Sequence, residues 1–151
     1  MTAPGASLHA SAVKVGDRAV LIRGPSGAGK SRLAFELIVC GRSGQVPPAV
    51  LVGDDRVHLA TVGGQLLVSP APALAGLIEV RGLGIRRLSC EALAVVGWVV
   101  DLAATDSERL PARESAVTEV FGILLPRLAV AAGADPYPLV IAALRTAESD
   151  Q

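Results

Sequence analysis

The sequence has few aromatic residues, no excess of charge and no long hydrophobic run. Aromatic side chains make up 3% of its 151 residues, 14 basic side chains balance 14 acidic ones, and the isoelectric point is near 6.7. Balanced charge gives no overall field that would attract nucleic acid or an anionic membrane. The longest apolar run, 92–100, stops at Asp101, far short of a membrane span. We therefore expect no nucleic-acid partner and no membrane insertion.

Cysteine is also scarce. The two cysteines, Cys40 and Cys90, form no C-x-x-C pair, so we expect buried thiols in a reducing compartment. Residues 1–13 lack the basic start and continuous apolar core of a signal peptide. A hydrophobic content of 51% suffices for one core. These features predict a soluble, cytoplasmic protein with a single domain over residues 1–151.

A glycine-rich motif stands between an apolar segment and an amphipathic one. It matches the phosphate-binding P-loop pattern G-x-x-x-x-G-K-[ST] at every fixed position. Its residues are Gly24, Pro25, Ser26, Gly27, Ala28, Gly29, Lys30 and Ser31. The loop amides would hold phosphate oxygens, Lys30 would reach the β- and γ-phosphates, and the Ser31 hydroxyl would bind Mg²⁺. A strand over Arg18–Arg23 and a helix over Ser31–Val39, closing at Gly41, favour this interpretation over a glycine-rich turn with an incidental lysine.

The remaining pattern is rich in strands. A hairpin strand at 7–15 precedes the P-loop strand, and a helix begins at the N-cap Asp135, with Pro136 in its first turn. Further strands are predicted at 49–52, 57–62, 65–68, 77–81, 85–88, 93–102 and, as one strand, 117–130, with a polar loop at 107–115. One helix near each end departs from the regular β–α alternation of adenylate-kinase-like folds. We therefore predict a strand-rich α/β fold with a P-loop helix and a C-terminal helix.

Two adjacent aspartates, Asp54 and Asp55, follow the short apolar strand at 49–52. Adjacent strand residues point to opposite faces, which predicts different roles for the two carboxylates. One could touch metal-bound water or orient a neighbour, while the other could accept a proton from an attacking hydroxyl. The alternative is an exposed acidic turn.

Other polar residues are weaker candidates. His9 could act in proton transfer or orient an aspartate, or it could be an ordinary strand histidine. Glu79 and Arg81 would share one face of a strand and offer a carboxylate for Mg²⁺ and a guanidinium for phosphate, unless they form a surface ion pair. Arg109 could clamp a phosphate or be an unremarkable loop residue.

His9, the motif GPSGAGKS, the segment GDDRV at 53–57 and the segment IEVRGLGI at 78–85 occur in a particular order. In order and approximate spacing they resemble the HPr kinase/phosphorylase family. The resemblance implies a P-loop fold of the phosphoenolpyruvate-carboxykinase type. It also implies ATP- and Mg²⁺-dependent phosphorylation of a serine on HPr, the small phosphocarrier of the sugar phosphotransferase system. Many members catalyse the phosphate-dependent reverse reaction, so phosphate and pyrophosphate are possible alternative substrates.

The same resemblance implies roles for individual residues. The catalytic residues would be Asp55, Lys30, His9, Asp54 and Arg109, and the Mg²⁺ ligands would be Ser31 and Glu79. Asp55 would take the serine proton during in-line transfer. Arg109 is matched through its context Glu108-Arg109-Leu110, and Arg81 would contribute to nucleotide binding.

The sequence departs from the family pattern in three places. It lacks the additional N-terminal domain, so it resembles the catalytic domain alone, as in short α-proteobacterial members. The resemblance implies a homo-oligomer, which is a hexamer in the family, but the missing domain weakens the expectation of a hexamer. Ala10 follows His9 where glycine is common, and residues 132–135 read Ala-Gly-Ala-Asp where many members have an arginine-containing segment linked to dephosphorylation. The alternatives are an ATP-sensing module that regulates a signalling partner and a small-molecule phosphotransferase.

Overall fold

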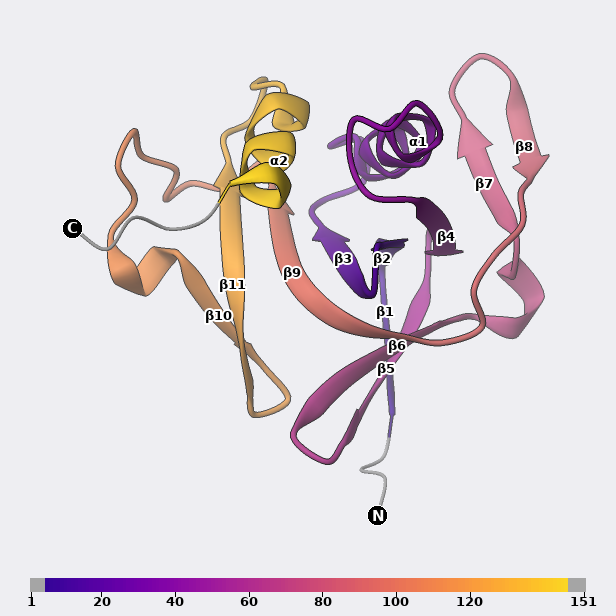
Figure 1. The fold of residues 1–151 in the computed structure, drawn as a ribbon, viewed down its shortest axis with the longest axis horizontal. Helices are drawn as coiled ribbons and strands as arrows, with labels where there is room; N and C mark the ends of the chain where they lie inside the picture. The colour runs from indigo at the N-terminus through magenta and orange to yellow at the C-terminus, as the bar shows by residue number, and fades with distance from the viewer. Residues whose placement is uncertain (1–4, 147–151) are drawn as a thin grey trace.

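Residues 5–146, which the computed structural model describes, form a curved sheet with two helices on one face (Figure 1). The strands are β1 (Ala6–Leu8), β2 (Ala10–Val15), β3 (Arg18–Arg23), β4 (Ala49–Gly53), β5 (Val57–Val62), β6 (Gln65–Pro70), β7 (Leu77–Val80), β8 (Gly84–Arg87), β9 (Ala94–Leu102), β10 (Val117–Val120) and β11 (Ile123–Val130). The α-helices are α1 (Lys30–Arg42) and α2 (Pro136–Arg145), and 3₁₀ turns occur at Pro72–Leu74 and Arg113–Ser115. The prediction of a strand-rich α/β fold is confirmed.

Strand β3, which leads into the P-loop, lies in the middle of the main sheet. The strand order is β1-β5-β6-β9-β3-β2-β4, and β11 pairs with β9 and carries β10 at its outer side. Strand β3 is parallel to β9 and antiparallel to β2. Its residues 19–22 are fully or almost fully buried, with alternate side chains entering two different hydrophobic clusters. A strand covered on both faces needs a continuous apolar run, which the segment AVLI supplies.

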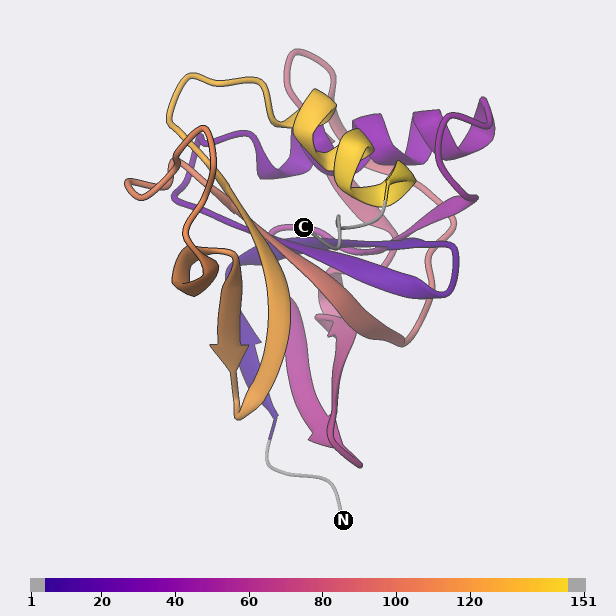
Figure 2. The same ribbon diagram turned by 60° about the vertical axis from the view of Figure 1, so that its left-hand side comes forward.

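Both helices pack on the same side of the sheet, as Figure 2 shows. Leu33, Leu37 and Ile38 of α1 are buried there, as their helical spacing predicts. The predicted end at Gly41 is wrong by one residue, since α1 continues to Arg42. A Cβ at Gly41 would lie 2.5 Å from the Ala49 nitrogen, so this glycine allows β4 to approach the helix. At α2, the Asp135 side chain accepts a hydrogen bond from the Tyr137 N–H, which confirms the predicted N-cap.

The single strand predicted at 117–130 is wrong. The segment forms the hairpin β10–β11, with Phe121 and Gly122 in its turn at φ values of 48° and 79°. Two consecutive positive φ values suit the twist of a two-residue hairpin, but the strand propensity of Phe121 conceals this turn in the sequence. The strands predicted at 57–62 and 65–68 are confirmed and form the hairpin β5–β6, in which β6 continues to Pro70.

Several other strand ends differ from the prediction by one or two residues, and two of the differences affect predicted site residues. The strand predicted at 7–15 divides at His9, because β1 pairs with β5 whereas β2 pairs with β3 and β4. The strand predicted at 77–81 ends at Val80, and Arg81 begins the turn to β8 in a separate two-stranded sheet beside α1 (Figure 1). Glu79 and Arg81 therefore do not share a strand face, as the sequence had suggested.

The cysteines also differ from each other. Cys40 is buried, but Cys90 is exposed, so the prediction of two buried thiols is wrong for Cys90. Cys90 lies in an isolated bridge to Leu51, outside the longer strands.

Between residues 5 and 146, neither helix is long and apolar enough to cross a bilayer.

Candidate active site

The P-loop connects the end of β3 to the start of α1. Gly27 and Gly29 have φ values of 81° and 102°, which other L-residues rarely adopt. The carbonyl of Gly29 accepts the first helical hydrogen bond, from the Leu33 N–H at 3.0 Å. The loop amides that follow Gly27 therefore lie at the N-terminus of a helix, where an anion is favoured.

Lys30 is largely buried, with 8% of its surface exposed. Its Nζ donates hydrogen bonds to the carbonyl oxygens of Gly24, at 2.7 Å, and Pro25, at 3.0 Å. Within residues 5–146 it forms no ion pair with a carboxylate. The ammonium group therefore lies over the loop with its charge available to an anion.

Asp54 is 3% exposed and accepts hydrogen bonds from three elements. The Ser31 hydroxyl donates to its two carboxylate oxygens at 2.8 and 2.9 Å, and the Ser11 hydroxyl donates at 2.6 Å. The backbone N–H of Glu79 donates at 3.3 Å. All three donors are neutral. Sequence reasoning missed Ser11, whose only signal is a polar residue in the buried strand β2.

Asp55 is exposed, whereas Asp54 is buried, and both lie in a turn after β4 and not within the strand. The φ of Asp55 is 67°, and the Arg56 N–H donates to the Asp54 carbonyl at 2.7 Å. This positive φ and the bond across one residue are features of a γ-turn, which is rare and strained. The turn aims the carboxylate at His9, whose Nε2 lies 3.3 Å from Asp55 Oδ1. The structure thus brings together two residues predicted to act in proton transfer.

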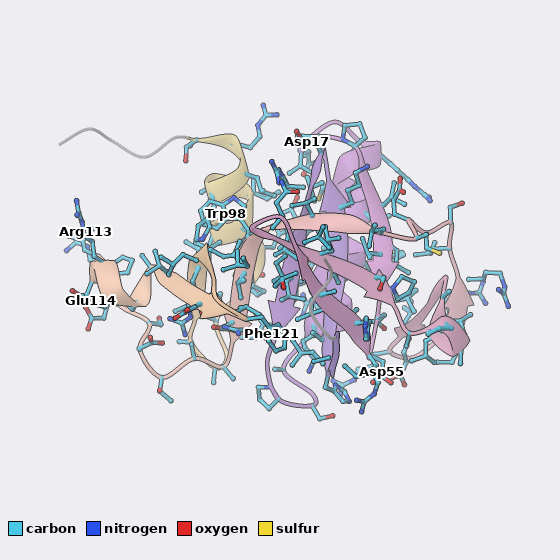
Figure 3. All side chains as sticks on the ribbon, turned by 90° about the horizontal axis from the view of Figure 1, so that it is seen from below. Asp17, Asp55, Trp98, Arg113, Glu114 and Phe121 are labelled. Atoms are coloured by element: carbon cyan, nitrogen blue, oxygen red, sulfur yellow. The ribbon has the colours of Figure 1, made fainter. Side chains whose placement is uncertain are left out.

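The other predicted site residues, Glu79, Arg81 and Arg109, have few or no contacts with Asp54 and Asp55. Glu79 contacts Asp54 through its backbone, while its side chain and that of Arg81 are exposed. Arg109 is exposed in the segment between β9 and β10 and, within residues 5–146, its side chain forms no hydrogen bond or ion pair. Figure 3 shows Asp55 and the turn at Arg113 and Glu114 on opposite sides of the molecule. Among residues 5–146, no hydrogen bond or ion pair joins Arg109 to Asp54 or Asp55.

A second charged cluster lies on the other side of β3, and sequence reasoning missed it. Asp101 accepts hydrogen bonds from Arg23 at 2.7 and 2.8 Å and from Arg127 at 2.6 Å. Arg127 also contacts Asp106 at 2.8 and 3.0 Å. Burial alone would raise the pKa of Asp101, but the hydrogen bonds and charges of the two arginines hold it below its ordinary value. The same contacts raise the pKa of Arg127, chiefly through its hydrogen bond with Asp106.

The oxygen donors beside the P-loop fit a hard cation such as Mg²⁺. Mg²⁺ in phosphate-transfer sites takes one or two protein carboxylates or hydroxyls and completes its shell with water and substrate phosphates. Ser31, Asp54 and Glu79 offer such oxygens, and Asp54 is a buried carboxylate without a cationic partner in the described part of the chain. No cluster of three or more His, Cys, Asp or Glu side chains suited to a metal occurs within residues 5–146.

The family comparison agrees with this geometry. A family model described as the HPr Serine kinase C-terminal domain matches residues 1–92, which is more than half of the chain. The chain belongs to the HPr serine kinase C-terminal domain family. The matched region includes the P-loop, the Asp54–Asp55 pair and the β7–β8 hairpin.

Curated relatives of this kinase family cover the chain to different extents. An HPr kinase/phosphorylase of Aromatoleum aromaticum is 37% identical over 155 residues, spanning 93% of this chain and 47% of the relative. That of Caldicellulosiruptor bescii is 34% identical, over 85% of this chain and 42% of the relative. That of Exiguobacterium sp. is 43% identical over 55% of this chain and 25% of the relative. The chain thus spans a quarter to about half of these relatives' lengths.

A solved structure shares the fold. The Hpr(Ser) kinase/phosphatase of Coxiella burnetii superposes with a TM-score of 0.73, at 23% sequence identity, over 93% of this chain and 88% of that chain. At this identity the likeness concerns the fold. It supports the arrangement of the curved sheet and its two helices as that of an HPr kinase domain.

Proposed function

We propose that this protein is an ATP- and Mg²⁺-dependent kinase that phosphorylates a serine of an HPr-like phosphocarrier protein. The observation that carries the proposal is that two neighbouring carboxylates beside the P-loop differ in burial and in hydrogen-bond partners. Asp54 is buried and bonded to the P-loop hydroxyl of Ser31, whereas Asp55 is exposed next to His9. One carboxylate can order the phosphate site while the other meets an incoming hydroxyl.

The protein groups would act in the following way. The loop amides and Lys30 hold the donor phosphates, and Asp54 fixes the Ser31 hydroxyl. Mg²⁺ held through Ser31 and Glu79 would neutralise phosphate charge. Asp55 accepts the proton of the serine hydroxyl while the serine oxygen bonds to the γ-phosphorus, the bond from that phosphorus to the bridging oxygen breaks, and ADP leaves. His9 orients Asp55 for this step.

The finer parts of the proposal follow from family membership. Arg81 and Arg109 are proposed phosphate contacts, the P-loop fold is proposed to be of the phosphoenolpyruvate-carboxykinase type, and a homo-oligomer is proposed for the assembled protein. The reverse reaction, in which phosphate attacks phosphoserine and yields pyrophosphate, lacks a cationic side chain at residues 131–135. We therefore expect the kinase direction to dominate.

The test is a transfer assay with γ-labelled ATP, Mg²⁺ and a purified HPr-like protein. We expect label on one serine, and an Asp55→Ala variant that transfers about 10³-fold more slowly, since a general base contributes about this much. Asp17→Ala is the matched control, because Asp17 is an exposed aspartate in another turn, on the opposite side of the view in Figure 3. Undiminished transfer by Asp55→Ala would contradict the assigned base. Tight ATP binding without any transfer would instead support an ATP-sensing module.

A further inference from the structure

One buried hydroxyl lies where the pattern of its neighbours favours an apolar side chain. Ser11 is in β2, on the face that packs against α1, and the next residues on this face are Val13 and Val15. Its side chain is fully buried, with 0% exposed. In the described part of the chain, the other buried polar or charged side chains are Lys30 and Asp54, both of the candidate active site. An apolar residue at position 11 would simply extend the core, so the hydroxyl needs another explanation.

The hydroxyl of Ser11 is committed to Asp54. It donates to Oδ1 of Asp54 at 2.6 Å, from a strand 43 residues earlier in the chain. The pairing of β2 with β4 shifts in register between Ala12 and Val13, and β4 ends directly before Asp54. Such an irregularity re-aims side chains and is common beside active sites. The irregular pairing therefore lies next to the Ser11–Asp54 bond, where the chain turns into the site.

The acceptor capacity of the Asp54 carboxylate is fully used. Oδ1 accepts from Ser11 and Ser31, and Oδ2 accepts from Ser31 and from the Glu79 N–H. An ionised carboxylate offers about four acceptor positions and donates no hydrogen bond. The single proton of the Ser31 hydroxyl must therefore lie toward Asp54. The lone pairs of the Ser31 oxygen are then left for a cation.

Among these contacts, the one from Ser11 selects the orientation of the carboxylate. The terminal torsion of an aspartate is broad, so the group turns unless its oxygens are held. Ser31 shares one proton between both oxygens, at 2.8 and 2.9 Å, and the Glu79 N–H is farther away, at 3.3 Å. The Ser11 bond is shorter than these, at 2.6 Å, and reaches one oxygen only.

We propose that Ser11 is a positioning residue of the phosphate site: it fixes the Asp54 carboxylate, which in turn fixes the Ser31 hydroxyl toward the metal and the donor phosphates. This inference rests on the proposed kinase function and adds β2 to the elements that prepare the P-loop. Ser11 itself touches no substrate, because its effect passes through Asp54. A purely structural role, support of the pairing of β2 with β4, predicts instead that any variant that weakens β2 has the same effect.

The test measures Mn²⁺ binding in the presence of ADP by electron paramagnetic resonance, which requires no phosphoryl transfer. Ser11→Ala should weaken Mn²⁺ binding about fivefold, the effect of losing one hydrogen bond. Ser11→Thr keeps the hydroxyl on a side chain suited to a strand and should stay within about twofold of the unmodified protein. Circular dichroism sets a temperature at which every variant is folded.

Val13→Ala is the matched control for destabilisation of β2. Val13 is fully buried on the same strand face as Ser11, but its side chain has no polar atom to bond to Asp54. Its truncation leaves a cavity and should lower the free energy of unfolding at least as much as Ser11→Ala does. We expect Mn²⁺ binding by Val13→Ala to stay within about twofold of the unmodified protein. Equal losses of Mn²⁺ binding in Val13→Ala and Ser11→Ala would overturn the positioning role.

Transfer kinetics give a second readout. With γ-labelled ATP and an HPr-like protein, Ser11→Ala should lower kcat about tenfold and leave KM for the acceptor within about twofold. The reason is that Ser11 bonds to Asp54, at the phosphate site, and not to the exposed Asp55. Ser11→Thr should recover most of kcat. Equal losses in Ser11→Ala and Ser11→Thr would show that the hydroxyl is not what matters.

The outcomes separate this inference from the proposed function. Mn²⁺ binding that falls in Ser11→Ala and returns in Ser11→Thr supports the positioning role, and an absence of transfer would then contradict only the kinase. Transfer by the unmodified protein, with Mn²⁺ binding and kcat unchanged in Ser11→Ala, would leave the kinase standing and overturn the role of Ser11. Failure of the unmodified protein to bind Mn²⁺ with nucleotide would overturn both.

Discussion

Two buried or half-buried aspartates flank the P-loop strand, and they differ in what neutralises them. Asp54 accepts hydrogen bonds only from hydroxyl and amide donors, with no cationic partner in the described chain. Asp101 is held by two guanidinium groups, from Arg23 and Arg127. Both carboxylates lie near strand ends at the same edge of the sheet, yet only one of them keeps its charge uncompensated.

We interpret this difference as one between a carboxylate proposed to act in ligand binding, Asp54, and a structural carboxylate, Asp101. A buried carboxylate without a cation is costly unless a ligand supplies the positive charge, so Asp54 marks the side of the P-loop where a metal and phosphates are expected. Asp101 instead ties β3, β9 and β11 together just before the P-loop begins. Substitution of Asp101 should therefore affect mainly stability, and substitution of Asp54 mainly ligand binding.

The largest expected effect is on stability at Asp101. Asp101→Asn leaves Arg23 and part of Arg127 without their carboxylate partner, and we expect the free energy of unfolding to fall by about 3 kcal/mol. Asp54→Asn should change it by less than about 1 kcal/mol, because the two hydroxyl donors can still bond to the amide oxygen. Urea unfolding followed by circular dichroism measures both. Equal destabilisation by the two variants would remove the distinction.

The next effect is on metal binding at Asp54. In the presence of ATP, Asp54→Asn should weaken Mn²⁺ binding about tenfold, as expected when a group that orients a metal ligand is lost. Asp101→Asn should change it less than about twofold at a temperature where the variant is folded. Electron paramagnetic resonance of free Mn²⁺ gives both constants. An unchanged constant in Asp54→Asn would mean that this carboxylate does not support the metal.

Features formed by residues close together in the sequence could be predicted, whereas contacts between residues far apart in the sequence could not. The strand–loop–helix order of the P-loop and the N-cap at Asp135 are local patterns, and both are confirmed, whereas Asp54 and Asp55 lie in a turn after β4 and not on the two faces of a strand. The Ser11–Asp54 bond joins residues 43 positions apart and depends on the pairing of β2 with β4. The Arg127–Asp101 bond depends on the parallel pairing of β9 with β11, which the missed turn at Phe121 concealed. Long-range pairing is the part that periodicity does not encode.

The exposure of Cys90 and the position of Arg81 also depend on tertiary structure. Cys90 is exposed because it lies in the segment that follows the small β7–β8 sheet, and its place there depends on tertiary structure. Arg81 lies outside the strand because the chain turns after Val80, where the Leu83 N–H donates a hydrogen bond to the Val80 carbonyl at 2.9 Å. Position by position, the family resemblance assigned Asp55, Lys30 and Ser31 to one site, and their roles there stay proposals.

The smallest expected effect is the acid dependence of stability. Arg23 and Arg127 lower the pKa of Asp101 against the opposing effect of burial, and Arg127 lowers that of Asp106. Below the unfolded pKa, about 3.9, the unfolded chain binds protons that the folded chain does not. Stability is therefore fully present above this pH and is lost as the pH falls through the folded values. Unfolding curves between about pH 6 and pH 2.5 should show this loss, with a shallower slope in Asp101→Asn.

The contrast is tested most directly by a single-turnover transfer from γ-labelled ATP to the serine of an HPr-like protein, with Asp54→Asn and Asp101→Asn measured side by side. The temperature is chosen so that circular dichroism shows both variants folded. We expect Asp101→Asn to transfer label within about tenfold of the unmodified protein and Asp54→Asn to be slower by about 10² or more, since its effect acts on transition-state charge. Equal loss in both variants, or greater loss in Asp101→Asn, would contradict the account.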